Sequence, residues 1–280
     1  MQSLDLYKKS YKIINIITLA SALLLLFAFA FSFDADSGYL LPSPLTTLFF
    51  ISYVIGVIVS VSPLFFANEF EHLDTPNTMT YKSKMYFTVS AVSSTLFGIL
   101  VFSLTQNVED VQMLLVSGVG LLFFGLFILN TLFFGYNFNI IKLIFLFGST
   151  AFPLSIGFGN NKNYYHHINS IENILTVLFC ISFLIYILYE AKRICTGRHS
   201  ELHFPSMLLT YMSGASLSLA YAFAFLFQNV NEGYRFYQMI MIFSISMHMV
   251  FESNRFVANA TPKSKYSKIE IEENQSNDNK

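Results

Sequence analysis

The chain has 280 residues and a formal net charge of -1; 54% of its residues are hydrophobic and 12% are charged. Soluble domains carry about 25% charged residues, so this composition indicates a protein embedded in the lipid bilayer and excludes an ordinary soluble domain. The near-neutral charge also excludes a nucleic-acid partner, because binding to phosphates needs a basic surface.

Eight apolar segments are long enough, or nearly so, to cross about 30 Å of hydrocarbon. In chain order they are residues 12–32, 45–67, 84–105, 112–134, 138–158, 170–190, 207–228 and 235–254. We therefore predict an all-α fold, a polytopic integral membrane bundle of eight transmembrane helices over residues 1–257. The fifth segment is the weakest, because it carries Lys142, Gly148 and Pro153.

The distribution of basic residues predicts the orientation of these spans. With the N-terminus inside and the spans alternating, only Lys162 and Arg235 of the 16 Lys and Arg residues lie outside. Basic residues concentrate on the cytoplasmic side of membrane proteins. The sequence therefore predicts that both the N-terminus and the C-terminus are cytoplasmic.

The first apolar segment has an alternative interpretation as a signal peptide. Three lysines precede it, and Ala28-Phe29-Ala30 matches the small-x-small pattern of a cleavage site. Its apolar core is longer than the usual 7–15 residues, so we expect it to remain as a span. Cleavage would leave seven spans and an N-terminus outside.

The segments between and after the spans are short and polar. None of the loops is large enough for a folded domain, and residues 258–280 are polar and charged, which predicts a disordered cytoplasmic tail. The bias toward Lys, Asn, Ile and Phe is typical of an AT-rich genome, which favours a multi-pass protein of a bacterial cytoplasmic membrane. Any activity should then lie between the helices or on the basic loops.

Small residues recur at intervals of four in two spans. They are Ser90, Ser94 and Gly98 in the third span, and Gly214 and Ser218 in the seventh. Such spacing lets helix backbones approach closely in lipid. We expect these residues to make helix–helix contacts inside the bundle rather than to bind a ligand.

A polar stripe runs along one face of the eighth span. Its members, spaced by three or four residues, are Gln238, Met241, Ser244, His248, Glu252 and Arg255. A polar face is costly against lipid, so it should face the bundle interior or a water-filled cavity. His248, Glu252, Ser244 and Gln238 are candidate substrate-binding or proton-relay residues. The alternative is that Glu252 and Arg255 are interfacial and that His248 bonds a neighbouring helix.

Gly148 and Pro153 mark a second candidate site in the fifth span. Proline removes a backbone hydrogen bond, and the surrounding Gly, Ser and Thr residues lower the cost of local unwinding. Transporters use broken helices of this kind at their substrate sites. A plain proline kink is the alternative.

Histidines and carboxylates also occur beside two spans. Glu69 and His72 follow the second span, while His199 and His203 precede the seventh. We expect both loops to be solvated polar segments; a zinc-type site shared between them is the alternative. No metal and no cofactor is predicted.

No sequence motif of nucleotide binding, serine hydrolysis or zinc proteolysis occurs in the chain. We therefore do not expect an enzyme. The leading hypothesis is a small-molecule or ion transporter, or a permease subunit, without its own energy-coupling domain. The alternative is a scaffold or sensor subunit that acts through a partner protein or a homo-oligomer. An intramembrane enzyme comes third.

Overall fold

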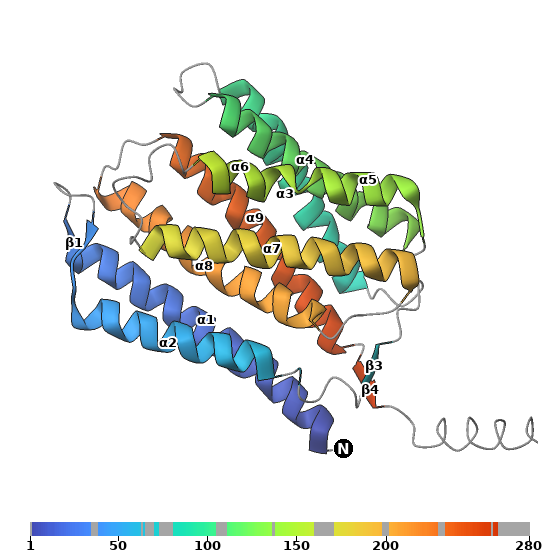
Figure 1. The fold of residues 1–280 in the computed structure, drawn as a ribbon, viewed down its shortest axis with the longest axis horizontal. Coiled ribbons are helices and arrows are strands. Elements are labelled where there is room, and N and C mark those ends of the chain that lie inside the picture. The colour runs from blue at the N-terminus through green and yellow to red at the C-terminus, as the bar shows by residue number, and fades with distance from the viewer. Residues whose placement is uncertain are drawn as a thin grey trace, which may run out of the picture.

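The protein is a bundle of long helices that run up and down past one another (Figure 1). The structure is a computed structural model of the whole chain. Its described residues are 2–34, 39–62, 64, 70–72, 81–104, 111–135, 138–159, 171–197, 202–228, 233–258 and 260–262.

Nine helices make up the bundle within this described part of the chain. They are α1 (Gln2–Ser32), α2 (Pro44–Val61), α3 (Tyr81–Leu104), α4 (Val111–Phe134), α5 (Ile140–Gly148), α6 (Ala151–Gly159), α7 (Ile171–Thr196), α8 (His203–Gln228) and α9 (Gly233–Ala258). Helices α5 and α6 follow one another along a single line in Figure 1, so together they make one traverse of the bundle.

Six traverses are long and apolar enough to cross a membrane, which makes the protein a multi-pass membrane protein. They lie in α1, α2, α3, α4, the α5–α6 pair and α7. Helices α8 and α9 have 26 residues each, but their described parts fall outside this set. The count of eight spans and the cytoplasmic position of both termini stay predictions.

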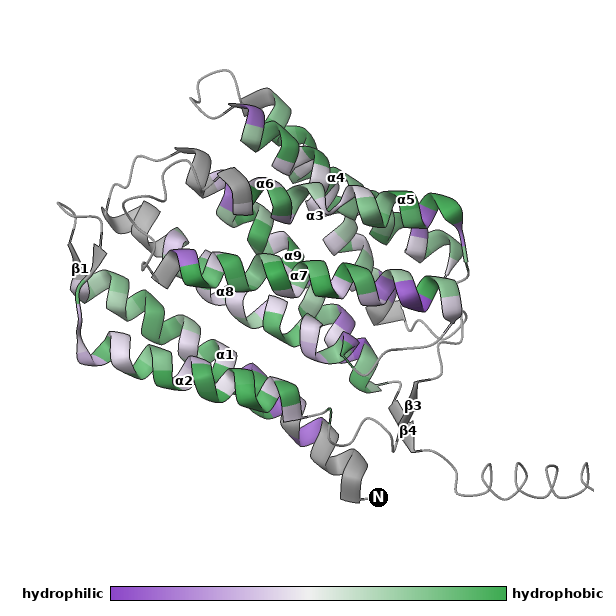
Figure 2. Cartoon of the chain, viewed as in Figure 1, coloured by the Kyte–Doolittle hydropathy of each residue, from purple (hydrophilic) through white to green (hydrophobic). Residues whose placement is uncertain are grey.

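Helices α8 and α9 occupy the centre of the bundle. Helix α8 packs against α1, α7 and α9, and α9 also packs against α3. From His203 to Ser218 almost every side chain of α8 is buried, including four serines and Thr210. Figure 2 shows α8 in pale colours beside the green outer helices. A helix that other helices shield from lipid can carry polar side chains, provided that these side chains find partners.

The fifth traverse contains a short turn in place of one continuous helix. Helix α5 ends at Gly148, and α6 begins at Ala151. The N–H groups of Ser149, Thr150 and Phe152 still bond to carbonyls within the segment. Pro153 lies in the first turn of α6, where its missing N–H costs little. The helix is therefore interrupted at this turn, but its backbone stays largely hydrogen-bonded.

Two pairs of very short antiparallel strands join segments at the ends of the bundle. Strand β1 (Phe33–Asp34) pairs with β2 (Tyr39–Leu40), and β3 (Phe70–His72) pairs with β4 (Ala260–Pro262). Strand β4 lies within residues 258–280, for which the sequence predicts a disordered tail, and it pairs with β3. The boundary of that tail stays a prediction. Residues 263–280 lie outside the described part.

Helix α1 is packed into the bundle along much of its length. It contacts α2 and α8, and Ile14, Leu25 and Ala28 are fully buried. Cleavage after Ala30 would remove this helix from the side of α8 and expose the surface that it covers.

Glycines bring α4 very close to its two neighbours. A Cβ atom built on Gly98 of α3 would lie 2.9 Å from the carbonyl oxygen of Gly118, and one on Gly125 would lie 2.8 Å from the backbone nitrogen of Thr95. On its other side, a Cβ on Gly120 would lie 2.3 Å from the backbone nitrogen of Phe152 in α6. Close backbone approach of this kind supplies the dispersion contacts that hold helices together in lipid.

Candidate functional site

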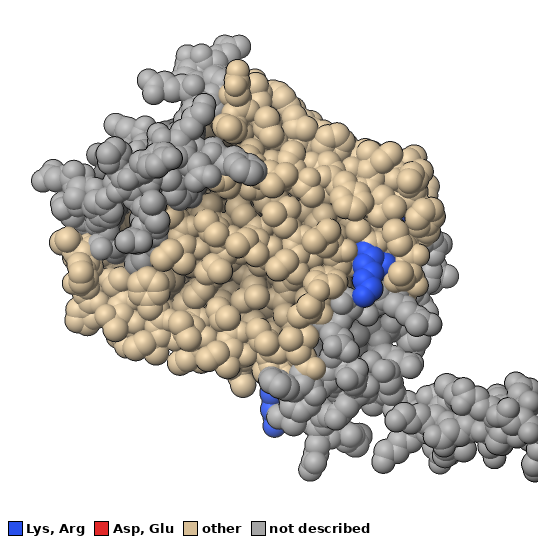
Figure 3. All heavy atoms as spheres, viewed as in Figure 1, with Lys and Arg blue, Asp and Glu red and all other residues tan. Residues whose placement is uncertain are grey.

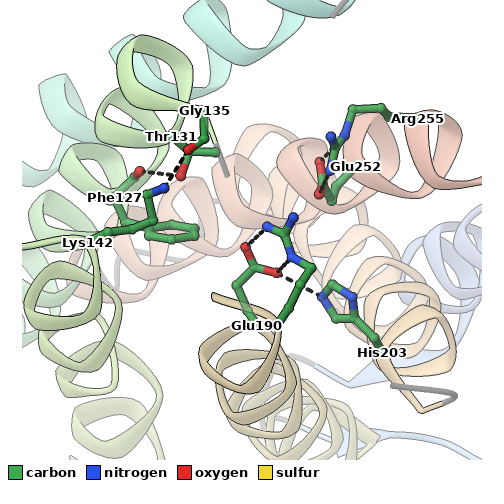
Figure 4. Close-up of polar contacts among 9 residues, drawn as sticks. Phe127, Thr131, Gly135, Lys142, Glu190, His203, Glu252 and Arg255 are labelled. Carbon is green, nitrogen blue, oxygen red and sulfur yellow. Dashed lines mark hydrogen bonds and ion pairs between the residues drawn. The ribbon is translucent and has the colours of Figure 1, made fainter. Parts of the chain in front are cut away.

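Seven buried titratable residues lie at one end of the bundle. We call them the charged cluster: Lys142, Glu190, Arg193, His203, His248, Glu252 and Arg255. They come from the start of α5, the end of α7, the start of α8 and the second half of α9. The up-and-down order of the helices brings these segments to the same end. Figure 4 shows three groups of side chains there: Glu190 with His203, Glu252 with Arg255, and Lys142 beside Gly135.

Glu190 is the centre of the first ion pair. Its carboxylate accepts a hydrogen bond from Arg193 Nε at 2.7 Å and a second from the same guanidinium, one turn further along α7. His203 at the start of α8 places its Nε2 atom 3.2 Å from Oε2 of Glu190. All three side chains are at most 2% exposed. The interaction therefore joins α7 to α8 inside the protein.

Aromatic rings enclose His203. Its imidazole stacks on Tyr186 of α7 at a centroid distance of 5.4 Å and meets the ring of Phe256 edge-on at 6.2 Å. These contacts fix the plane of the imidazole and aim Nε2 at the carboxylate. The sequence predicts a solvated loop here, but His203 is the first residue of α8 and is fully buried. His199 and Glu69 lie outside the described residues.

Glu252 and Arg255 form a second ion pair with the same spacing. Arg255 donates from Nε to Glu252 at 3.0 Å and from Nη2 to the other carboxylate oxygen. The guanidinium carbon also lies 5.6 Å from the centre of the Phe87 ring in α3. A desolvated contact of this type between a cation and an aromatic face stabilises the pair further.

His248 is buried one turn deeper on α9. Its Nδ1 atom lies 3.1 Å from the hydroxyl of Ser90 in α3. The rings of Phe87 and Phe124 meet its imidazole edge-on at 5.3 and 5.2 Å. His248 is also within electrostatic range of Glu190, Glu252 and Arg255, which connects it to both ion pairs.

Lys142 lies on the other side of the first ion pair. Its ammonium group donates to the carbonyl of Gly135, the residue that follows α4 and has a positive φ of 67°. A cation at the end of a helix complements its dipole. Lys142 is fully buried and interacts electrostatically with Arg193 and Glu190. With it, the cluster contains two arginines and a lysine against two carboxylates, in addition to the two histidines.

The remaining residues of the polar stripe on α9 are also buried. The hydroxyl of Ser244 lies 2.9 Å from that of Ser94 and 3.1 Å from that of Ser93, both in α3. Gln238 lies closer to the start of α9 and is 5% exposed. The stripe thus packs on α3 through paired serines and the His248–Ser90 contact, and it does not face lipid.

The other candidates make contacts between helices away from the cluster. A Cβ on Gly148 would lie 2.7 Å from the Phe123 ring, and Pro153 is buried in α6. A Cβ on Gly214 would lie 2.1 Å from Ser246 Oγ, and the Ser218 hydroxyl donates to the Met239 carbonyl at 3.2 Å. Gly148 and Pro153 are therefore not part of one site with His248.

Sequence reasoning missed Glu190 and Arg193 as members of the site and treated His203 as a loop residue. One signal was present. Glu190-Ala-Lys-Arg193 and Glu252-Ser-Asn-Arg255 share the pattern Glu-x-x-Arg at the ends of two apolar segments. In a helix this spacing places the carboxylate and the guanidinium side by side, so each pair can remain buried.

The chemistry available here is that of charge and proton exchange. Within the described residues, no group of three or more His, Cys, Asp or Glu side chains is arranged to hold a metal ion. Glu190 and Glu252 can accept protons, and both histidines can carry them. The excess of basic over acidic groups favours the entry of an anion.

Comparison with known proteins gives no relative to set beside this arrangement. No family model, no curated protein and no solved structure matches the chain.

Proposed function

We propose that the bundle transports a small polar solute or an ion, and that the charged cluster closes one end of its pathway in this conformation. The observation that supports the proposal is the burial of two Glu–Arg pairs, two histidines and a lysine within the same end of a membrane bundle. Ionisable groups at such depth are costly, and in membrane proteins they typically mark ion pathways and proton relays.

The arrangement suits a gate that opens by exchange of partners. Glu190 on α7 already contacts His203 on α8, whereas Glu252, Arg255 and His248 all lie on α9. A proton or an anion that enters the cluster would compete for Glu190 or its partners and weaken the contact between α7 and α8. Opening by this route would hydrate the stripe from Glu252 toward Ser244.

A sensor or scaffold subunit is the second candidate, and the packing of His248 favours it. An apolar groove on the outer surface is lined by α2, α7 and α8. Neither His248 nor Glu252 borders this groove. Edge-on phenyl rings and the Ser90 hydroxyl surround the imidazole instead. In this case the cluster ties the helices together, and a partner protein carries the activity.

Water access to the stripe distinguishes the two functions without knowledge of the solute. Ser244→Cys, in a Cys180→Ala and Cys195→Ser background, should react with a charged methanethiosulfonate added to either side of reconstituted vesicles. A transporter exposes its pathway alternately to both sides, so both additions should label the thiol. The measurement is the modification rate by mass spectrometry.

Native Cys195, kept in a chain that carries only Cys180→Ala, supplies the control for sidedness, because it is exposed at the end of α7. It should react from one side only, and that side identifies the end of the bundle that carries the charged cluster. Transport would be contradicted if the Ser244→Cys variant reacts from neither side while Cys195 reacts normally in the control chain. That result would favour the sensor or scaffold.

A further inference from the structure

An apolar groove opens on the outer surface of the bundle, at the same end as the charged cluster but lined by other side chains of α7 and α8. Helix α8 forms its floor, and α2 and α7 supply its walls. Its volume is about 430 Å³, and its α7 wall includes Ser182, Ile185, Leu188, Tyr189 and Lys192. Figure 3 shows that the described surface on this side is almost free of charge, with blue basic side chains toward one end.

The groove has the length of one lipid leaflet. Ser182 and Lys192 lie ten residues apart on α7, which corresponds to about 15 Å at 1.5 Å per residue. Half of a hydrocarbon core of about 30 Å is the same distance. The groove therefore extends from the membrane surface, at Lys192, to about the middle of the bilayer, at Ser182.

Polarity changes along the groove in the same direction. Lys192 is exposed at the outer end, while Leu188, Ile185 and Leu202 present apolar side chains that are 62%, 38% and 42% exposed. The two serines at the wall and floor are satisfied inside the protein: Ser182 donates to the Phe179 carbonyl and Ser206 to the His203 carbonyl. The walls thus offer one cationic group at the surface and mainly apolar contact below it.

We propose that this groove binds one anionic phospholipid of the leaflet on the basic side of the protein. Its acyl chain would lie along α8 between α2 and α7, and its phosphate would meet the ammonium group of Lys192. Basic residues at the rim of a groove between membrane helices attract anionic headgroups. A zwitterionic lipid would fill the apolar part but would gain less from Lys192. The proposal does not depend on transport.

Spin-labelled lipids test the proposal on the full chain in bilayers. Phosphatidylglycerol or phosphatidylcholine, each with a nitroxide on the acyl chain, is added in trace amounts to vesicles of unlabelled phosphatidylcholine that contain the protein. Electron paramagnetic resonance then gives the motionally restricted fraction. We expect about a fivefold preference for phosphatidylglycerol, in line with one basic residue near the surface, and a smaller preference at high salt.

Two variants and a control locate the effect. Lys192→Gln should bring the ratio of restricted phosphatidylglycerol to restricted phosphatidylcholine close to one. Ile185→Trp fills the apolar part of the groove and should reduce the restricted fraction of both lipids. Lys84→Gln is the matched control, because Lys84 is an exposed lysine at the start of α3 and does not border the groove. It should leave the preference unchanged.

Equal restriction of the two lipids in the unmodified chain would overturn the proposal, as would an unchanged preference in Lys192→Gln. Absence of restricted lipid, together with a homodimer in bilayers that Ile185→Trp dissociates, would assign the groove to a second copy of the chain instead.

Discussion

Replacing Glu190 with Leu should lower the free energy of unfolding by about 3–5 kcal/mol, the usual cost of removing one partner from a buried ion pair. The loss arises because buried Arg193 loses the two hydrogen bonds that its guanidinium donates to the Glu190 carboxylate. For a chain of this size the thermal midpoint should fall by roughly 10 °C.

Removing both charges should restore most of the lost stability. In Glu190→Leu/Arg193→Leu no charge of this pair remains to be desolvated, and apolar side chains of similar volume often replace buried ion pairs without loss. Glu252→Leu and Glu252→Leu/Arg255→Leu form the matched set on α9. Equal destabilisation by the single and the double variants would show that the pair contributes through packing alone.

Buried Cys180 provides the measurement. The chain contains no Trp, so a thiol-reactive dye that becomes fluorescent on coupling can follow thermal unfolding in detergent. Cys180 is buried and free, whereas Cys195 is exposed and would react before unfolding. All variants therefore carry Cys195→Ser, and the midpoint of the fluorescence rise reports exposure of Cys180.

Gly120→Ala is the second substitution with a large expected effect. The new Cβ would lie 2.3 Å from the backbone nitrogen and 2.8 Å from the Cα of Phe152, so α4 and α6 must separate. Overpacking of this kind costs about 1–3 kcal/mol, which exceeds the gain of about 0.5–1 kcal/mol that alanine brings to a helix. The same dye assay should show a lower midpoint.

Gly157→Ala is the matched control for this prediction. Gly157 belongs to α6, and a Cβ built on it would meet no atom within 4 Å. The thermal unfolding midpoint of the Gly157→Ala variant should stay the same or rise slightly, because only the helix propensity changes. If the two alanine variants unfold at the same temperature, the close contact between α4 and α6 does not limit stability.

The positions of the spans could be predicted from hydropathy because each traverse must cover the same thickness of hydrocarbon. Predicted residues 112–134 coincide with α4 (Val111–Phe134) within one residue. The predicted end at residue 67 extends past α2, which stops at Val61; Pro63 lacks the N–H that would continue the helix. Hydropathy does not register a missing N–H.

The ends of α7 and α8 differ from the prediction for an electrostatic reason. The sequence places the end of one span at residue 190 and the start of the next at residue 207, because charged residues lie between them. In the structure α7 continues to Thr196 and α8 begins at His203. Glu190, Arg193 and His203 neutralise one another and remain buried, so charge does not end these helices.

The contacts that build the candidate site could not be predicted from a single sequence. Ser90 and His248 are 158 residues apart, and nothing local indicates that α3 lies beside α9. The stripe on α9 predicted which side chains share a face, but not the helix that they meet. That information depends on the packing order of the whole bundle.

The central position of α8 and α9 has a consequence for how the protein is made. The inner faces of both helices carry serines, two histidines and the Glu252–Arg255 pair, and these groups need partners inside the bundle. Both helices leave the ribosome after the other seven, and proteins form from the N-terminus during synthesis. The six apolar traverses are therefore already in place to receive them, and the centre of the bundle assembles after the helices that surround it. A chain that stops before Ser244 would leave α3 without the serine and histidine partners that cover its inner face.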